Sequence, residues 1–251
     1  FKNLKLIFSM GAGVDHILDD DSIPKDIPIS RIVDPQMAFS MTNYIVMAVL
    51  NYQRCLYDFQ DAQKRNHWAQ FEFDEKNLKI GILGIGHLGL DAANTLYRMG
   101  FEVFGYSNSR KETIFPSFYG NQLSEFLNKI NVLVCTVPLT PKTKGLLSAK
   151  LFNDLAFPTY LINVSRGAVH VESDIMKAIK EGKLTGAFLD VFEKEPLPKD
   201  SLLWGNPKIK ITPHIASLTY AKESIRQALE NFRRIENGEK PLNEVNRDNM
   251  Y

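Results

Sequence analysis

A run of apolar residues leads directly into a glycine-rich turn, and this junction constrains the fold more than any other segment of the chain. The segment Lys79–Leu83 predicts a strand, and a helical pattern follows three glycines spaced Gly-x-Gly-x-x-Gly: Gly84, Gly86 and Gly89. The first glycine permits a tight turn, the second lets backbone approach a pyrophosphate, and the third lets the helix pack near the strand. His87 and Leu88 open the helix, whose N-terminus offers free N–H groups to phosphates. We therefore predict a dinucleotide site; a tight turn without a ligand is the alternative.

Composition narrows the class of protein. The 251 residues are enough for one large or two modest domains, and a hydrophobic content of 44% is enough for a substantial core. A formal net charge of +1 gives no reason to expect nucleic acid or an anionic membrane as partner. No apolar run approaches membrane-spanning length. Cys55 and Cys135 form neither a disulfide framework nor a metal-ligand spacing. We expect a cytoplasmic protein without a metal site.

Strands and helices alternate along most of the chain, and several strands are apolar almost throughout. This pattern is typical of a parallel sheet covered by helices on both faces, so we predict a doubly wound α/β fold. Besides Lys79–Leu83, the expected strands are Lys5–Phe8, Ile29–Val33, Glu102–Tyr106, Val132–Thr136, Tyr160–Val164, Gly186–Leu189 and Lys208–Thr212. The expected helices are Met37–His67, His87–Met99, Ser124–Asn128, Glu172–Glu181 and Ala221–Asn237, the last capped by Gly238.

The two flanks of the chain do not belong to the alternating run, and we expect them to meet as a second domain. The predicted division is a partial substrate domain over residues 1–37, a dinucleotide-binding domain over 38–218, and a C-terminal helix over 219–251 that returns to the substrate domain. This arrangement places a cleft between the two domains. The chain starts on what reads as an interior strand, so we expect an upstream segment of the substrate domain to be missing.

Three charged or titratable residues lie just past apolar strands, where the carboxyl ends of a parallel sheet face a ligand. They are Arg166, Glu195 and His214. Each alone has an ordinary alternative: a surface salt bridge, a loop residue and a satisfied structural histidine. Together they provide an arginine for a carboxylate and a Glu–His pair for a proton, beside a dinucleotide that carries a hydride. The combination favours reduction of a 2-oxo acid.

Four motifs resemble the signatures of the D-isomer-specific 2-hydroxyacid dehydrogenases and occur in that family's order: Leu83–Gly89, Asn163–Gly167, Leu189–Pro196 and Thr212–His214. The resemblance covers essentially the whole chain. Further details are similar to the bacterial NADPH-dependent glyoxylate/hydroxypyruvate reductases of the A type: Met10–Asp15, Val33–Pro35, Val169–Val171, Glu195–Pro198 and Tyr251. The resemblance implies a Rossmann-type dinucleotide-binding domain and a smaller, flavodoxin-like substrate domain built from both chain ends.

The resemblance also implies roles for the site residues. His214 is expected to protonate the carbonyl oxygen during reduction, a role that suits an imidazole at neutral pH. Glu195 is expected to hold the imidazole and stabilise its protonated form. Arg166 is expected to bind the substrate carboxylate and polarise the ketone through its planar fork of donors.

Two further groups are assigned by the same resemblance. The loop of Gly11, Ala12 and Gly13 is expected to bind the substrate carboxylate through backbone N–H groups, although residue chemistry alone favours a plain strand–helix turn. Pro138 and Asp190 are expected to contact the cofactor. Asp190 is the expected acceptor from the nicotinamide carboxamide, and a turn cap is its alternative.

The end of the second Rossmann strand indicates which dinucleotide is preferred. NAD-specific sites place a carboxylate there, about 20 residues beyond the glycines, to bind the ribose 2′-OH. This chain instead has Ser107, Ser109 and Arg110, with no carboxylate among them. Hydroxyls and a guanidinium suit a 2′-phosphate. We therefore predict NADPH, with NADH as a possible second cofactor; a solvated basic turn is the alternative.

The sequence predicts the quaternary structure with one alternative left open. The Met37–His67 pattern has more apolar and aromatic residues than one helix face requires, and similar helices in the family help to form dimers, so we predict a homodimer. The alternative is a core helix of a monomer.

The predicted substrate is a small 2-oxo acid, glyoxylate or hydroxypyruvate. The rival functions are a D-lactate-type dehydrogenase, a phosphoglycerate dehydrogenase and a non-catalytic, dinucleotide-sensing corepressor.

Overall fold

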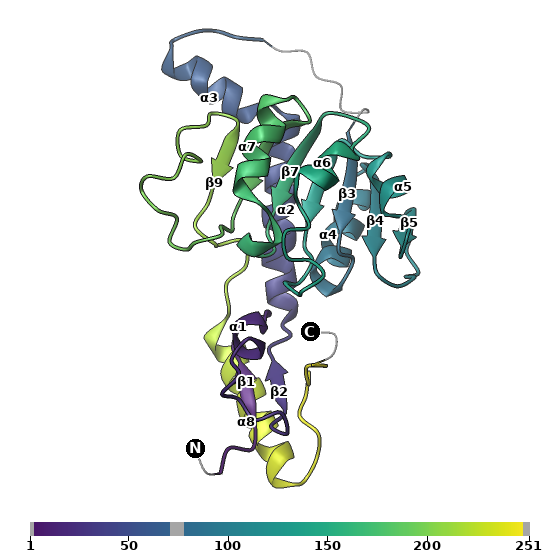
Figure 1. Cartoon of the computed structure of the whole chain (residues 1–251), viewed down its shortest axis with the longest axis vertical. Helices are drawn as coiled ribbons and strands as arrows, with labels where there is room; N and C mark the ends of the chain where they lie inside the picture. Colours follow the sequence, from purple (N-terminus) through teal and green to yellow (C-terminus); the bar gives the residue numbers. More distant parts are fainter. Residues whose placement is uncertain (1–2, 71–77, 248–251) are drawn as a thin grey trace.

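The computed structural model describes residues 3–70 and 78–247, and its larger part is built on one parallel sheet (Figure 1). The strand order is β5-β4-β3-β6-β7-β8-β9, and every neighbouring pair is parallel. The strands are β3 Lys79–Leu83, β4 Glu102–Ser107, β5 Ser117–Tyr119, β6 Val132–Cys135, β7 Thr159–Asn163, β8 Leu184–Leu189 and β9 Ile209–Ile211. The order reverses beside β3, where a doubly wound sheet leaves a crevice for a ligand.

Helices cover both faces of this sheet, as the apolar strands predict. One face carries α2 (Pro35–Gln53) and α4 (His87–Arg98), and the other carries α5 (Leu123–Leu127), α6 (Ala149–Asn153) and α7 (Glu172–Lys180). Within β6, Val132 and Val134 join the first core, whereas Leu133 and Cys135 join the second. Alternate residues of one strand therefore fill two separate cores, and the predicted doubly wound fold is confirmed.

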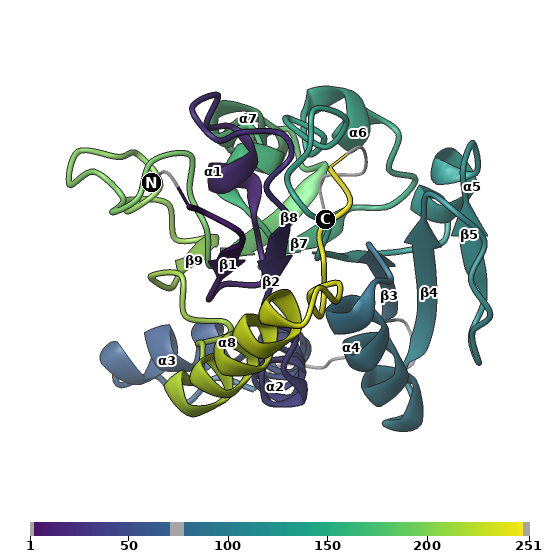
Figure 2. The same ribbon diagram turned by 90° about the horizontal axis from the view of Figure 1, so that it is seen from below.

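The two flanks of the chain lie together in a smaller part of the molecule, below the sheet in Figure 1. It contains β1 (Ile7–Ser9) parallel to β2 (Ile29–Arg31), the short helix α1 (Asp15–Leu18) and the long helix α8 (Ala221–Glu236). Figure 2 shows α8 beside these strands. The Asn231 amide donates to the Ser30 hydroxyl at 2.9 Å. The predicted meeting of the flanks is confirmed, while the boundaries near residues 37 and 218 stay a prediction.

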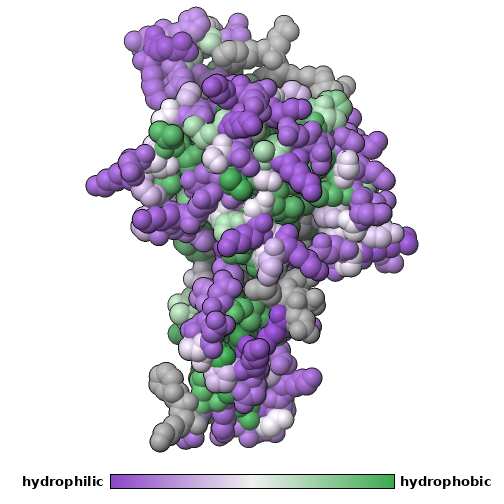
Figure 3. Space-filling view, viewed as in Figure 1, coloured by the Kyte–Doolittle hydropathy of each residue, from purple (hydrophilic) through white to green (hydrophobic). Residues whose placement is uncertain are grey.

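The exposed surface of the smaller part is partly apolar. Figure 3 shows apolar residues gathered on this part below the larger, mostly hydrophilic one. On α8, three large apolar side chains at helical spacing are more than half exposed: Ile225, Leu229 and Phe232. The opposite side of α8 carries the buried polar residues Ser224, Gln227 and Asn231, which bind the rest of the smaller part through hydrogen bonds or pack against it.

The single helix expected over Met37–His67 is wrong. The chain forms two helices, α2 and α3 (Leu56–Lys64), because Cys55 adopts a left-handed conformation with φ +52°. Neither glycine nor proline marks this break. Four short elements were also not predicted: α1, β5, α6 and the 3₁₀ helix η2 (Gly167–Val169). The predicted cap at Gly238 is confirmed by its φ of +71° and its N–H bond to Ile235. Tyr251, which the sequence analysis names among the details similar to the A-type reductases, lies outside the described residues.

Candidate active site

The glycine-rich turn has the strand–turn–helix context that a dinucleotide site requires. Gly84 follows β3 with φ +107°, a backbone conformation that residues other than glycine rarely adopt. A Cβ at Gly89 would lie 2.2 Å from the carbonyl oxygen of Gly84, so only glycine lets α4 begin this close to the strand. A Cβ at Gly86 would meet nothing within 4 Å. The first and third glycines therefore serve the fold, while the second faces open space where a ligand can approach.

The N-terminus of α4 fits a pyrophosphate. Its N-cap is Gly86, and no side chain caps the helix. The Thr136 hydroxyl donates to the Gly84 carbonyl at 2.7 Å and fixes the turn from the neighbouring loop. Unpaired N–H groups and the positive end of the helix dipole are therefore directed at the place where phosphates bind in such folds. Pro138 lies on the same neighbouring loop, beyond β6, and its carbonyl accepts from Thr143.

Two substitutions in this turn separate folding from cofactor binding. Gly89→Ala is expected to cost about 1–3 kcal/mol of unfolding free energy, because the new methyl group collides with backbone. Gly86→Ala is expected to keep the wild-type stability, since its methyl group enters open space, yet to weaken NADPH binding by blocking the pyrophosphate. Urea denaturation and fluorescence titration with NADPH measure the two effects. Wild-type cofactor affinity in Gly86→Ala would contradict the assignment.

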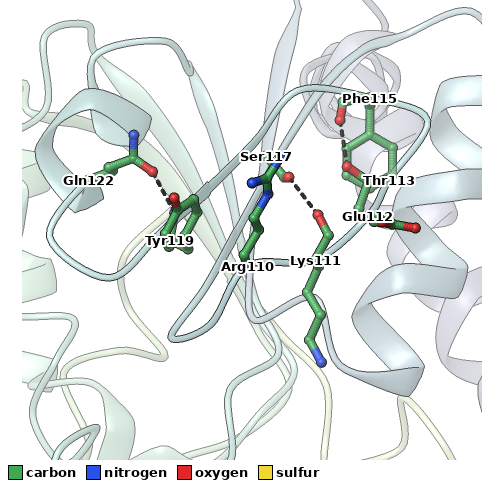
Figure 4. A pocket seen from close by; sticks show the side chains of 8 residues that line it. All are labelled: Arg110, Lys111, Glu112, Thr113, Phe115, Ser117, Tyr119 and Gln122. Atoms are coloured by element: carbon green, nitrogen blue, oxygen red, sulfur yellow. Dashed lines mark hydrogen bonds between the residues drawn. The ribbon is translucent and has the colours of Figure 1, made fainter.

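A cavity of about 520 Å³, the β4 cavity, is lined largely by the segment that follows β4, and this segment includes Arg110, which is expected to bind a 2′-phosphate (Figure 4). Arg110 stands between Tyr119 and Lys111 in this view, and no ion pair within the described residues involves its guanidinium. The complete lining is Arg110, Lys111, Glu112, Thr113, Phe115, Ser117, Tyr119 and Gln122. Predicted residues Ser107 and Ser109 do not line it; instead the Ser107 hydroxyl donates to the Ser109 carbonyl at 2.6 Å and shapes the turn.

The structure brings Glu195 and His214 into direct contact. The imidazole Nδ1 of His214 lies 2.7 Å from Oε2 of Glu195, and the other carboxylate oxygen accepts from the backbone N–H of Phe192 at 3.0 Å. Both side chains are partly exposed, at 44% and 35%. The carboxylate is thus anchored to its own loop while it orients the ring. This leaves Nε2 as the ring atom that can exchange a proton with a substrate.

Asp190 holds the turn that carries His214. Its carboxylate is fully buried and accepts from the Thr212 hydroxyl at 2.7 Å and from the backbone N–H groups of Ile215 and Ala216 at 2.9 and 2.8 Å. The Thr212 hydroxyl also contacts that of Tyr44, and burial raises the pKa of Tyr44. The geometry matches the turn-cap alternative for Asp190. Its contact with a nicotinamide carboxamide stays a prediction.

Arg166 follows β7 and faces the predicted substrate loop. Its Nη1 donates to the Ser165 carbonyl at 2.9 Å, and its Nε donates to Oδ1 of Asp15 at 3.1 Å. A Cβ at Gly13 would lie 1.8 Å from Nη2, so the loop and the guanidinium are in contact. The N–H of Gly11, however, is bonded to the Ser9 hydroxyl at 3.2 Å. The N–H of Gly11 therefore stabilises the loop. The N–H groups of Ala12 and Gly13 remain the predicted donors to the substrate carboxylate.

The three predicted catalytic residues follow three adjacent strands, β7, β8 and β9. The loops after β7 and β8 are in close contact, because a Cβ at Gly167 would lie 1.7 Å from the carbonyl oxygen of Phe192. The loop after β9 is tied to the loop after β8 through the bond from His214 N to Asp190 O at 2.8 Å. Sheet order therefore gathers the predicted trio at one edge of the sheet.

Sequence reasoning missed two groups at this edge. One is Asp15, the partner of Arg166, whose charge two residues after Gly13 was the available signal. The other is a buried pair below Arg166, in which the Asn163 amide lies 2.8 Å from Nδ1 of His170. His170 is 2% exposed. This pair supports the backbone of the turn, since Asn163 also accepts from the N–H of Ser165 at 3.0 Å.

Three further features concern the described residues outside this edge of the sheet. No three His, Cys, Asp or Glu side chains there are grouped as metal ligands. Burial raises the pKa of the Cys135 thiol to about 11, so it stays protonated at neutral pH. None of the described helices combines the length and the apolar character needed to span a bilayer.

Comparison with known proteins agrees with this geometry. The NAD binding domain of the D-isomer specific 2-hydroxyacid dehydrogenases matches residues 46–216. A glyoxylate/hydroxypyruvate reductase A of Photorhabdus laumondii subsp. laumondii is 41% identical over 244 residues, which cover 94% of this chain and 78% of that protein.

Two solved structures share the fold over the whole chain. An NADPH-dependent glyoxylate/hydroxypyruvate reductase of Sinorhizobium meliloti, in complex with NADP and sulfate, has a TM-score of 0.95 at 34% identity, with 100% of this chain and 81% of that chain covered. A D-isomer specific 2-hydroxyacid dehydrogenase of Xanthobacter autotrophicus Py2, in complex with NADPH and MES, has a TM-score of 0.95 at 38% identity, with coverage of 100% and 80%. The resemblance drawn from the motifs is confirmed: this chain belongs to the D-isomer-specific 2-hydroxyacid dehydrogenase family.

Proposed function

We propose that this protein reduces a small 2-oxo acid, glyoxylate or hydroxypyruvate, to the corresponding 2-hydroxy acid, in the D configuration where the product is chiral, with NADPH as reductant. The observation that carries the proposal is the contact of 2.7 Å between His214 and Glu195 at the sheet edge that also holds Arg166. A histidine paired with a carboxylate can donate a proton, and an arginine at the same edge of the sheet suits an anionic substrate. The names of the relatives support the same substrates.

Arg166, His214 and Glu195 have separate roles in the proposed reaction. Arg166 binds the substrate carboxylate and polarises the ketone, assisted by the N–H groups of Ala12 and Gly13. NADPH supplies the hydride that adds to the carbonyl carbon. His214 gives the proton on Nε2 to the carbonyl oxygen, and Glu195 stabilises the protonated ring before the transfer. In the reverse direction the neutral imidazole accepts that proton.

The proposed cofactor site runs from the glycine turn to the β4 cavity. Gly84, Gly86 and Gly89 shape the pyrophosphate site at the start of α4, where His87 and Leu88 supply N–H groups. Arg110 provides the charge for the 2′-phosphate. The NADP and NADPH complexes of the structural relatives support this choice.

A steady-state panel tests the proposed function. The protein is assayed with glyoxylate, hydroxypyruvate, pyruvate and phenylpyruvate, each with NADPH and with NADH. We expect the highest kcat/KM with glyoxylate or hydroxypyruvate and NADPH. Preference for pyruvate or phenylpyruvate would favour a D-lactate-type dehydrogenase. Tight NADPH binding without turnover of any 2-oxo acid would favour the dinucleotide-sensing alternative.

We further propose a cytoplasmic homodimer. Both cysteines are free thiols, as expected in a reducing compartment. The aromatic residues that suggested a dimer are largely used within the chain, since Tyr52 stacks on Tyr160 and Tyr44 packs against Phe188. The support that remains is the exposed apolar surface of α2 and the segment after α3, formed by Phe39, Met47 and Trp68. Analytical ultracentrifugation, which is expected to show twice the mass of one chain, tests the proposal.

A further inference from the structure

One ion pair links the smaller part of the molecule to the predicted substrate arginine. Asp15 opens α1 in the smaller part, and Arg166 follows β7 of the large sheet. Arg166 Nε donates to Asp15 Oδ1 at 3.1 Å, and the two side chains are only 31% and 19% exposed. The two residues are 151 positions apart in sequence. The contact is therefore a product of the tertiary fold and not of local chain geometry.

The donors of the guanidinium are divided between different partners. Nε is bound by Asp15, and Nη1 is bound by the Ser165 carbonyl at 2.9 Å. Nη2 lies against Gly13, where a Cβ would approach it to 1.8 Å. Because two of its three nitrogens are held, the planar group has a fixed orientation, and the third nitrogen, Nη2, lies against the loop expected to bind the substrate carboxylate.

We propose that Asp15 is a positioning residue, which sets the orientation of Arg166 for a 2-oxo acid carboxylate. The inference rests on the proposed function, because it gives Arg166 the same substrate. Asp15 acts through Nε and does not need to touch the substrate. A guanidinium held at Nε loses less conformational freedom when it binds an anion, so the contact lowers the cost of substrate binding.

The direction in which the KM changes when Asp15 is removed separates a positioning role from a simple charge effect. If Asp15 acted only as a negative charge near an anionic substrate, its removal would lower the KM. If Asp15 positions Arg166, its removal raises the KM. Asparagine distinguishes the two further, because its side-chain oxygen still accepts from Nε but carries no charge. Positioning predicts that asparagine restores binding, whereas the charge effect predicts that it behaves like alanine.

The test is a kinetic comparison of Asp15→Ala and Asp15→Asn with glyoxylate and NADPH. We expect Asp15→Ala to raise the KM for glyoxylate about tenfold, the scale of one lost charged hydrogen bond, with kcat changed less than about threefold. We expect Asp15→Asn to stay within about threefold of wild type in both constants. In an Arg166→Ala background, Asp15→Ala is expected to add no further loss, because the two residues act as one unit.

Controls keep the outcomes separate. Asp19→Ala removes an exposed carboxylate from the other end of α1 and is expected to leave the KM unchanged. Thermal melting and NADPH titration check folding; if Asp15→Ala melts early, Asp15→Ser, which is too short to reach Nε, replaces it. An unchanged or lowered KM in active Asp15→Ala, or additive losses with Arg166→Ala, overturns the positioning role alone. Absence of turnover in the wild type overturns the proposed function together with it.

Discussion

Replacing His214 with alanine is expected to lower kcat for 2-oxo acid reduction at least about a hundredfold, the usual scale of general acid catalysis. The residue that donates to the carbonyl oxygen is then absent, and water must supply the proton. NADPH affinity is expected to stay at the wild-type value, because the glycine turn and the β4 cavity do not involve His214. Steady-state kinetics and fluorescence titration measure the two quantities on the same preparation.

Glu195→Gln supplies the matched control. The Glu195 carboxylate lies 2.7 Å from the His214 ring, and Glu195→Gln removes its negative charge while keeping a similar shape. We expect kcat to fall in Glu195→Gln, but less than in His214→Ala, because the imidazole that donates the proton is kept. Near-normal turnover in His214→Ala would leave His214 a structural role only.

The parts of the fold that could be predicted are those encoded in short stretches of chain. The glycine turn is one: its spacing after an apolar strand predicts a strand–turn–helix unit, and the structure has Gly84 with positive φ and Gly89 packed against Gly84. The placement of Arg166, Glu195 and His214 at one edge of the sheet is another, while their catalytic roles stay a prediction. Parallel strands end at a common edge, so residues following β7, β8 and β9 were expected to lie together without knowledge of any side-chain contact.

The features that were missed depend on contacts between distant segments. Cys55 separates α2 from α3 through its left-handed conformation, and neither glycine nor proline marks this break in the sequence. Asp190 is surrounded by donors from residues 212–216, and no local pattern shows that its carboxylate is already used. Asp15 meets Arg166 only because the smaller part folds against the sheet edge. Predicting these roles requires the register of neighbouring strands and the packing of the loops. Composition and hydrophobic periodicity do not provide either.

The second large effect is expected at the 2′-phosphate site. Arg110→Ala is expected to weaken NADPH binding about tenfold to a hundredfold, the equivalent of roughly 1.5–3 kcal/mol for a hydrogen bond to a charged group. NADH, which lacks the phosphate, is expected to bind as it does to the wild type. Dissociation constants for both cofactors, measured by fluorescence titration, give the ratio that decides the assignment. Arg110 is exposed, so its replacement is expected to leave the folding stability unchanged.

Ser107→Asp tests the same site by the opposite route. A carboxylate at the end of β4 repels a 2′-phosphate and can accept from a ribose 2′-OH, so NADPH is expected to bind more weakly and NADH more tightly. Glu112→Gln serves as the charge control, because it removes a negative charge from the cavity lining and is expected to strengthen NADPH binding slightly. If Arg110→Ala and Ser107→Asp both kept the wild-type ratio of the two affinities, the phosphate would have to bind elsewhere, and the basic turn after β4 would be solvated surface.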